Sequence, residues 1–280
     1  MKIIVAVDGS KFSRWATDLL VGLPLAEEPE IEIMHVVDVP TVTEALIAPS
    51  MVEKYRKGSA AMAEKKFELA QRLTAQVLER VRKRWSRVGA IITRGPVADT
   101  IVARARKEKA DLIIVGARGL SNIQRFLLGS VSQKIVTYAP CAVLVVKQKI
   151  RALKRVLVAV DGSKASDKAV RFLRTRFVPK KLQGTVMYVW EYPIHPHPSS
   201  ALMQVIAKKY SEPLARSGLR TNAMWVMGHS AQKIVNVASQ KRPHLIVVGS
   251  RGLTGLNRFL LGGVSHQVVK HSREAVLVVR

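Results

Sequence analysis

The chain has 280 residues, and 46 Lys and Arg against 20 Asp and Glu give a formal net charge of +26. At roughly 100–200 residues per domain, this length predicts two domains, each with its own core. The hydrophobic share of 48% is that of a globular protein, so a disordered basic tail does not account for the charge. The single cysteine, Cys141, excludes a disulfide framework and a cysteine-based zinc site.

The first predicted strand is the β-branched run IIVAV at 3–7, typical of a strand buried on both faces of a parallel sheet. It ends at Asp8, too early for a signal-peptide core, and no uncharged apolar segment approaches the roughly 20 residues that cross a bilayer. We therefore expect a cytoplasmic protein without a transmembrane segment. A helix that includes Trp15 and Leu19 is predicted to begin after Asp8-Gly9-Ser10.

Further strands are predicted at 31–37 (IEIMHVV) and 90–93 (AIIT), with a long amphipathic helix between them. That helix is indicated by apolar residues three to four positions apart: Met62, Phe67, Ala70, Leu73, Val77, Val81 and Trp85. After Gly95-Pro96 a helix is predicted as far as Lys109. A strand at 111–116, a helix near 129–138 and a strand at 141–146 follow. The alternation of strands and helices predicts a doubly wound parallel sheet, an α/β Rossmann-like fold.

The second half of the chain repeats the first. The heptapeptide VAVDGSK occurs at 5–11 and again at 158–164. Segments 116–136 and 249–269 are identical at 12 of 21 positions, and AVLVV ends both halves. We therefore predict a tandem duplication with domains at 1–149 and 152–280, joined by a basic linker over 147–154. The second copy lacks about 20 residues of the long-helix segment, which prolines at 193, 196, 198 and 213 are expected to shorten and break.

A glycine-rich pattern follows the fourth predicted strand, in segments 116–119 (GARG) and 129–132 (GSVS). The glycines of the first segment can take positive φ and admit a ligand close to the backbone. The second segment starts a helix, whose free N–H groups and dipole favour an anion, with the hydroxyl of Ser130 or Ser132 as a further donor. Asp8 could accept from a ribose hydroxyl or hold Mg²⁺. The alternative is that the glycines only close turns and Ser130 is an N-cap.

These residues resemble the universal stress protein family, in its ATP-binding subgroup with the signature G-x2-G-x9-G-[ST]. The resemblance covers both halves and implies two domains that pair through their last strands, Cys141–Val146 and Glu274–Val279, as an internal pseudo-dimer. It implies adenine held at Val36 over the small Ala6, with Asp8 near the ribose. The phosphate positions that it implies are Gly116, Gly119, Gly129, Ser130, Val131 and Ser132, with Arg118 close by.

The second half departs from this signature at one position, where Gly263 replaces Ser or Thr. The lost hydroxyl predicts weaker ATP binding or an empty site, unless Ser265 compensates. The residues of this second candidate site are Asp161, Val189, Gly249, Gly252, Gly262, Gly263, Val264 and Ser265.

Function is expected to be regulatory, because no Ser-His-Asp or paired-carboxylate arrangement occurs at repeated positions. Any ATP hydrolysis or adenylyl transfer would be incidental. Basic runs at 80–87, 104–109, 147–155 and 171–181 leave a second hypothesis open, a module that contacts RNA, DNA or an anionic membrane without sequence specificity. The other explanation of these runs is a solvated basic surface. Further homodimerisation stays open.

Three single features receive the simpler interpretation. His195 and His197 could share a metal, but a solvated proline-rich loop is favoured, and no metal site is predicted. Cys141 is interpreted as a small buried apolar residue rather than a reactive thiol. His35 is interpreted as a strand residue rather than a base.

Overall fold

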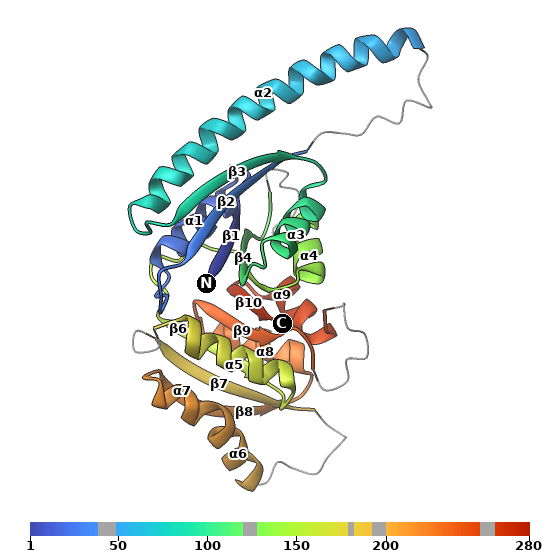
Figure 1. Ribbon diagram of the computed structural model, residues 1–280. Helices are drawn as coiled ribbons and strands as arrows, with labels where there is room; N and C mark the ends of the chain where they lie inside the picture. Colours follow the sequence, from blue (N-terminus) through green and yellow to red (C-terminus); the bar gives the residue numbers. More distant parts are fainter. Residues whose placement is uncertain (39–48, 120–127, 179–181, 192–199, 253–260) are drawn as a thin grey trace.

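Ten strands form one continuous sheet in the order β3-β2-β1-β4-β5-β10-β9-β6-β7-β8 (Figure 1). The computed structural model describes residues 1–38, 49–119, 128–178, 182–191, 200–252 and 261–280, with the backbone alone for 49–63, 200 and 202. Domain 1 contributes β1 Lys2–Ala6, β2 Glu30–Val37, β3 Val88–Arg94, β4 Leu112–Gly116 and β5 Ala142–Val146. Domain 2 contributes β6 Arg155–Val160, β7 Gln183–Trp190, β8 Arg220–Met227, β9 Leu245–Gly249 and β10 Ala275–Val279. Within each domain all neighbouring strands are parallel, which confirms the predicted fold class.

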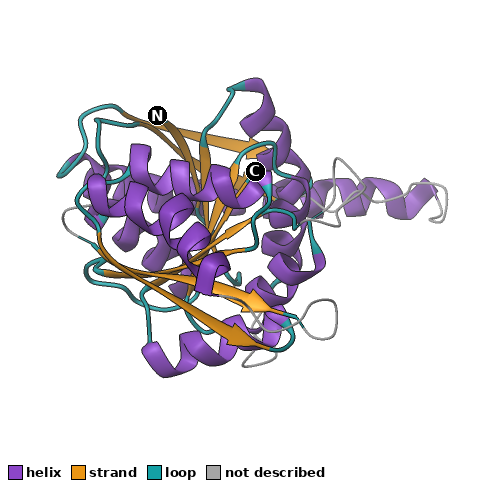
Figure 2. Cartoon of the chain, turned by 90° about the horizontal axis from the view of Figure 1, so that it is seen from below, coloured by secondary structure: helices purple, strands orange, loops and turns teal. Residues whose placement is uncertain are grey.

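Helices cover both faces of the sheet, as a doubly wound fold requires (Figure 2). In domain 1 they are α1 Lys11–Gly22, α2 Pro49–Arg82, α3 Val97–Lys107 and α4 Ser130–Tyr138. In domain 2 they are α5 Lys164–Arg176, α6 Ser200–Ile206, α7 Glu212–Arg216, α8 Ser230–Lys241 and α9 Gly263–His271. Helices α1, α2 and α5 pack into one core with one face of the strands, and α3, α4, α8 and α9 pack into a second core with the other face.

The long helix α2 confirms the three-to-four spacing of apolar residues, although it ends at Arg82 and Trp85 packs beyond its end. Its C-terminal part lies against β2 and β3, and its other end extends away from the domain (Figure 1). In domain 2 the matching segment is short: α6, a π-helical turn at Ala207–Ser211, and α7, which has Pro213 in its first turn. The prolines at 193, 196 and 198 lie outside the described residues. None of the helices described is both long and apolar enough to cross a membrane.

The two domains join through their last strands. Strand β10 pairs antiparallel with β5, with Val276 opposite Val145 and Leu277 opposite Leu144. Every residue of both AVLVV strands is buried, so the pairing continues the hydrophobic core from one domain to the other. This arrangement confirms the internal pseudo-dimer. The linker between β5 and β6 packs against it through the buried side chains of Ile150 and Leu153.

A pair of cations at equivalent positions crosses the boundary between the domains. The Lys147 ammonium donates to the carbonyl oxygens of Val269 and Ser272, at the C-terminus of α9. The Arg280 guanidinium donates at 2.6 and 2.7 Å to the carbonyl oxygens of Val136 and Thr137, at the C-terminus of α4. Each domain therefore caps the orphan carbonyls of a helix in the other domain, where the helix dipole favours a positive charge.

The Lys147 cap makes stability depend on pH in a defined direction. Burial, and secondarily the charge of Arg118, lower the pKa of Lys147 from 10.5 to about 8. Between these values the unfolded chain binds the proton and the folded chain does not, so the free energy of unfolding rises with pH. Between pH 8 and 10 we expect the free energy of unfolding of the wild type to rise by up to about 2 kcal/mol more than that of Lys147→Arg. The arginine of this variant keeps its charge over the whole range. Urea unfolding of both proteins across this pH range measures the difference. If the free energies of unfolding of the two proteins changed in parallel with pH, the prediction would be refuted.

Candidate functional site

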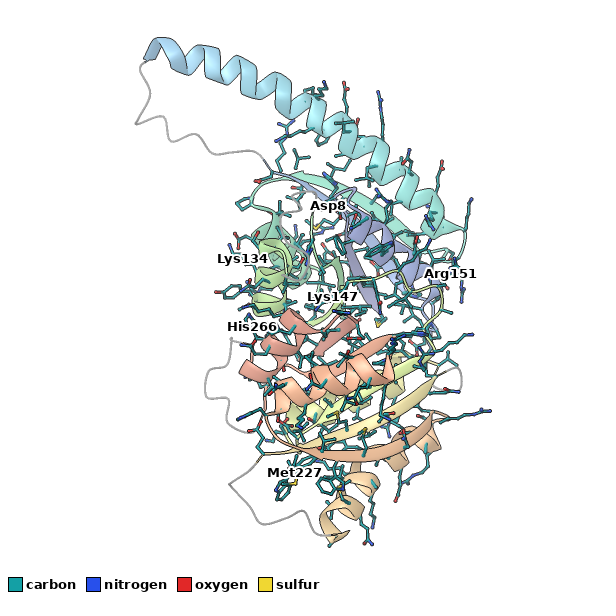
Figure 3. The ribbon with its side chains drawn as sticks, turned by 180° about the vertical axis from the view of Figure 1, so that it is seen from behind. Asp8, Lys134, Lys147, Arg151, Met227 and His266 are labelled. Atoms are coloured by element: carbon teal, nitrogen blue, oxygen red, sulfur yellow. The ribbon has the colours of Figure 1, made fainter. Side chains whose placement is uncertain are left out.

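The candidate sites lie at the carboxyl ends of adjacent strands where the strand order reverses. In domain 1, β1 lies between β2 and β4, and Asp8 follows β1 while Gly116 ends β4. In domain 2, Asp161 follows β6 and Gly249 ends the neighbouring β9. This is the edge at which doubly wound sheets bind ligands. Figure 3 shows Asp8 at this edge, and Lys147 where the two domains meet.

A strand-end carboxylate is held in the same way in both domains. The backbone N–H of Ser10 donates to Oδ1 of Asp8 at 2.9 Å, and that of Ser163 donates to Oδ1 of Asp161 at 3.0 Å. The intervening residue is Gly9 at φ +79° in domain 1, a conformation that side chains rarely adopt, and its copy at position 162 has φ +88°. One carboxylate oxygen is thereby fixed to the turn, and the other remains to face a ligand.

The second oxygen of each carboxylate faces the glycine loop. A Cβ atom added to Gly119 would lie 2.9 Å from Oδ2 of Asp8, and one added to Gly252 would lie 2.8 Å from Oδ2 of Asp161. A side chain at either position would displace the carboxylate. The structure therefore brings Asp8 together with Gly119, and Asp161 with Gly252, as the repeat implied.

The glycines that end β4 and β9 have a packing reason for being glycine. A Cβ atom on Gly116 would lie 2.7 Å from the backbone carbonyl carbon of Phe12, and one on Gly249 would lie 2.7 Å from that of Ala165. Neither Gly116 nor Gly119 has a positive φ, so the conformational freedom that the sequence allowed them is not used. Here glycine lets the start of the helix after the first strand approach the neighbouring strand.

Helices α4 and α9 begin at the glycine loops without side-chain caps. Their N-cap residues are Gly129 and Gly262, each extended and without a side-chain cap hydrogen bond. The N-cap alternative for Ser130 is therefore wrong, since Ser130 is the first residue of α4. The amides of 130–132 and 263–265 have no acceptor within their helices, because first-turn N–H groups lack one. Such a start, at the positive end of the dipole, can hold an anion.

The serine hydroxyls near these helix starts differ in availability. Ser132 is buried and donates to the carbonyl oxygen of Gly116 at 2.7 Å, and Ser265 donates to that of Gly249 at 2.6 Å. Both hydroxyl protons are thus committed to the end of the adjacent strand. Ser130 is exposed, and a Cβ atom on its counterpart Gly263 would meet nothing within 4 Å. The structure therefore leaves room for the side chain that domain 2 lacks.

A cavity of about 80 Å³ marks the site in domain 2. It gathers six of the predicted residues: Asp161, Val189, Gly249, Gly252, Val264 and Ser265. Gly262 and Gly263 are at the adjacent helix start and do not line it. Arg251, the counterpart of Arg118 in the repeated glycine loop, also lines it. The remaining lining residues were not predicted: Ala159, Val160, Ser166, Ser230, Ile234 and Val248. Ala159 could have been found from the repeat, because it matches Ala6 in the first copy of VAVDGSK.

The two sites differ beside the carboxylate. In domain 1 the neighbour is His35, whose pKa is lowered by burial, with the backbone of Val7 and the charge of Asp8 opposing that shift. In domain 2 the equivalent position holds Tyr188, whose pKa is raised by burial and by the charge of Asp161. An imidazole and a phenol therefore stand at equivalent positions near equivalent carboxylates, so the two copies present different hydrogen-bonding groups.

The remaining interpretations concern single residues. Cys141 is only partly buried, and desolvation raises the pKa of its thiol to about 12, so it stays protonated and is not a reactive thiol. Arg118 lies with its guanidinium carbon 5.7 Å from the centre of the Phe12 ring, above the start of α1. His195 and His197 lie outside the described residues. Over the part of the chain that is described, no group of three or more His, Cys, Asp or Glu could hold a metal ion.

Two doubly wound domains on one sheet, each with a carboxylate facing a glycine loop and an uncapped helix start, define a tandem α/β protein with a duplicated candidate site. The chain belongs to the universal stress protein family, whose model matches residues 1–147 and 152–280. It is 30% identical over 152 residues to the universal stress protein YxiE of Bacillus subtilis (strain 168), covering 52% of this chain and 98% of that protein.

Two solved structures share the fold over nearly the full length. One is a universal stress protein from Archaeoglobus fulgidus DSM 4304, with a TM-score of 0.68 at 22% identity, covering 100% of this chain and 96% of that one. The other is a functionally unknown protein from Pseudomonas aeruginosa PAO1, with a TM-score of 0.61 at 18% identity, covering 99% and 92%. The tandem arrangement of this chain therefore occurs in other solved proteins.

Proposed function

We propose that the chain binds ATP in domain 1, and more weakly in domain 2, as a regulatory ligand in a stress response with little or no turnover. The observation that carries the proposal is the repeated pairing of a strand-end carboxylate with a glycine loop and an uncapped helix start. In domain 1 the phosphates would meet the amides of 130–132, with Arg118 beside them.

The proposal extends to the ribose and the base, whose positions the family resemblance implies. Oδ2 of Asp8 is the oxygen left for a ribose hydroxyl or for Mg²⁺ on the phosphates, since Oδ1 is bonded to Ser10. The base would lie over Ala6, against the backbone of Val36, both at the ends of neighbouring strands and both nearly buried. A small side chain at position 6 leaves space for a flat ring.

Domain 2 is expected to bind more weakly for a physical reason. Gly263 keeps its amide and lacks the hydroxyl that Ser130 offers. Ser265 does not compensate in this proposal, because its hydroxyl proton is bonded to the carbonyl of Gly249. A hydrogen bond to a charged group contributes about 1.5–3 kcal/mol, or roughly 10- to 150-fold in affinity.

A matched pair of substitutions tests the assignment. We expect Ser130→Ala to weaken ATP binding in domain 1 by about 10-fold or more, because it removes a donor to a charged phosphate. We expect Gly263→Ser to strengthen the domain 2 site by a similar factor. Calorimetric titration of both proteins with ATP measures the effects, and unchanged affinity in both would remove the hydroxyl argument.

Regulation would act through the helices that start at the phosphates. Helix α4 begins at the domain 1 loop and ends on Arg280 of domain 2, and α9 begins at the domain 2 loop and ends on Lys147 of domain 1. An anion at either start strengthens the dipole interaction along a helix that the other domain caps. ATP hydrolysis that disappears in Asp8→Ala would replace this proposal with an enzymatic one.

A further inference from the structure

A basic pocket lies along the linker, away from the glycine loops of domain 2. It has a volume of about 640 Å³ and is formed by 148–152, 154–155, 242–244 and 273–274, with Ser239. Arg155 begins β6, and residues 242–244 and 273–274 directly precede β9 and β10. The linker pocket, as we call it, is thus at the amino ends of the strands whose carboxyl ends carry the domain 2 site.

The charge lining this pocket is strongly unbalanced. It contains six Lys and Arg residues: Lys149, Arg151, Lys154, Arg155, Arg242 and Arg273. The one carboxylate that lines it, Glu274, is buried, accepts from the backbone N–H of Arg273 at 3.0 Å and interacts with Lys147 across the domain boundary. Glu274 is therefore engaged by the backbone of Arg273 and by Lys147, and the six cations outnumber this one carboxylate in the lining.

At the equivalent position of domain 1, nearby carboxylates neutralise the positive charge. There Lys2 occupies the position of Arg155, and its ammonium lies 3.3 Å from Glu30 and 2.5 Å from Glu108. The carboxylate of Asp111 accepts from the backbone N–H of Lys2 at 2.8 Å and pairs with Arg176 at 3.2 Å. Two carboxylates, Glu30 and Glu108, thus neutralise this cation, and a third, Asp111, holds its backbone amide.

The second copy has lost all three carboxylates at equivalent positions. Gln183 replaces Glu30 beside the same strand residue, Lys241 replaces Glu108, and His244 replaces Asp111. Uncharged acceptors fulfil the structural role instead. The Arg155 guanidinium donates to the carbonyl oxygen of Arg242 at 2.9 and 3.3 Å, and the backbone N–H of Lys154 donates to Nδ1 of His244 at 3.0 Å. These hydrogen bonds are made without acidic side chains, so the positive charge of the cations can attract an anion.

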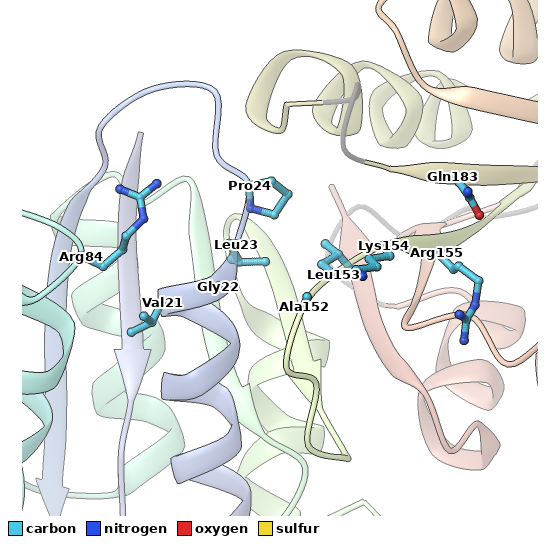
Figure 4. Close-up of a pocket in the computed structure, with 10 residues that line it drawn as sticks. All are labelled: Val21, Gly22, Leu23, Pro24, Arg84, Ala152, Leu153, Lys154, Arg155 and Gln183. Atoms are coloured by element: carbon cyan, nitrogen blue, oxygen red, sulfur yellow. The ribbon is translucent and has the colours of Figure 1, made fainter.

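The positive charge also acts on His244, which lines the pocket. The pKa of His244 is lowered by burial first and then by the charges of Arg155 and Lys154. On the other side of the linker, Lys154 and Arg155 also line a hollow of about 560 Å³ together with Arg84. Figure 4 shows Arg84 and Arg155 on opposite sides of that hollow, with the linker residues between them.

We propose that the linker pocket binds a small solute carrying two or more phosphate groups. Its volume lies in the range of about 300–1,000 Å³ usual for small-molecule sites. Four of its six cations are arginines, whose planar fork matches phosphate oxygens in pairs. A multiply charged phosphate can engage cations from the linker, from the end of α8 and from the loop before β10 at once.

The test uses inorganic tripolyphosphate and a matched pair of variants. Arg242 and Lys109 occupy the same left-handed position after α8 and α3, with φ of 47° and 50°. We compare Arg242→Glu with Lys109→Glu by calorimetry, in a full-length background carrying Gly119→Asp and Gly252→Asp to close both glycine loops. Arg242→Glu is expected to weaken tripolyphosphate by at least about 10-fold, and Lys109→Glu by less than about 2-fold.

A second readout applies even if a variant is unstable. Tripolyphosphate bound to the otherwise unchanged chain should raise the pKa of His244, followed by its imidazole proton resonance and assigned with His244→Asn. Equal affinity of the two glutamate variants, or an unmoved His244, would overturn the proposal. So would binding of single-stranded RNA that tripolyphosphate does not displace, because the surface would then serve a polynucleotide. Failure of ATP to bind the glycine loops leaves this comparison unaffected.

Discussion

Gly119→Asp is expected to abolish ATP binding in domain 1, with a loss of at least about 100-fold, or roughly 2.7 kcal/mol. The new side chain starts 2.9 Å from Oδ2 of Asp8, so it displaces the carboxylate assigned to the ribose. It also adds a negative charge where the phosphates would meet the start of α4, and like charges in a partly buried site repel strongly. Calorimetric titration of the variant with ATP measures the loss.

Two controls separate this effect from general damage. Gly252→Asp makes the same change 2.8 Å from Oδ2 of Asp161 and should remove only the weaker domain 2 site. Gly89→Asp adds the same charge on β3, where a Cβ atom meets nothing within 4 Å, and should leave both sites intact. ATP bound by Gly119→Asp with wild-type affinity would show that the glycine loop of domain 1 is only structural.

Gly116→Ala is expected to lower the free energy of unfolding by about 2–3 kcal/mol, because the core there has no room for a methyl group. The added Cβ would lie 2.7 and 2.8 Å from backbone atoms of Phe12 and Ser13, which cannot turn aside as a flexible side chain can. Gly249→Ala should cost a similar amount, since its Cβ would meet backbone atoms of Ala165 at 2.7 and 2.9 Å.

Urea denaturation checks this expectation against Gly89→Ala, a position with open space around the added Cβ. That control should be neutral or slightly stabilising, because glycine weakens a strand interior. If Gly116→Ala were as stable as the wild type but failed to bind ATP, Gly116 would serve the ligand directly, and the packing explanation would be wrong.

Repetition made the topology predictable from the sequence. Two copies of VAVDGSK and of AVLVV indicated the order of the strands along the chain, and the pairing of the last strands, β5 and β10, followed from the family resemblance. Its antiparallel direction was not predicted. The location of Asp8 and Gly116 at adjacent strand ends also followed, because a parallel sheet brings carboxyl ends to one edge.

The sequence was less informative about what each site residue does. Gly116 looked like a flexible turn residue and proves to be a packing residue, since its constraint comes from Phe12, far away in the chain. Ser132 looked like a phosphate donor, and its hydroxyl proton is bonded to the carbonyl of Gly116. Gly116 and Phe12 are more than 100 residues apart in the chain, and Ser132 and Gly116 are 16 residues apart. A local sequence pattern contains neither distance.

The charge of +26 also gains a location only in three dimensions. The basic run at 147–155 and residues 242–244 before β9 are far apart in the chain, and the fold brings them to one pocket. The missing acids are visible only after the two domains are aligned through their strand registers, which place Gln183 where Glu30 stands in the first copy. The positive charge around the linker pocket therefore comes from the loss of carboxylates as well as from basic residues.

We propose above that the duplicated glycine loops of this universal stress protein hold an adenine nucleotide. The most direct measurement is mass spectrometry of the small molecules released from the purified full-length chain, followed by calorimetry of the emptied protein with ATP. We predict that an adenine nucleotide is recovered from the wild type, and much less of it from Gly119→Asp. Recovery of no nucleotide, together with no binding at millimolar ATP, would contradict the account.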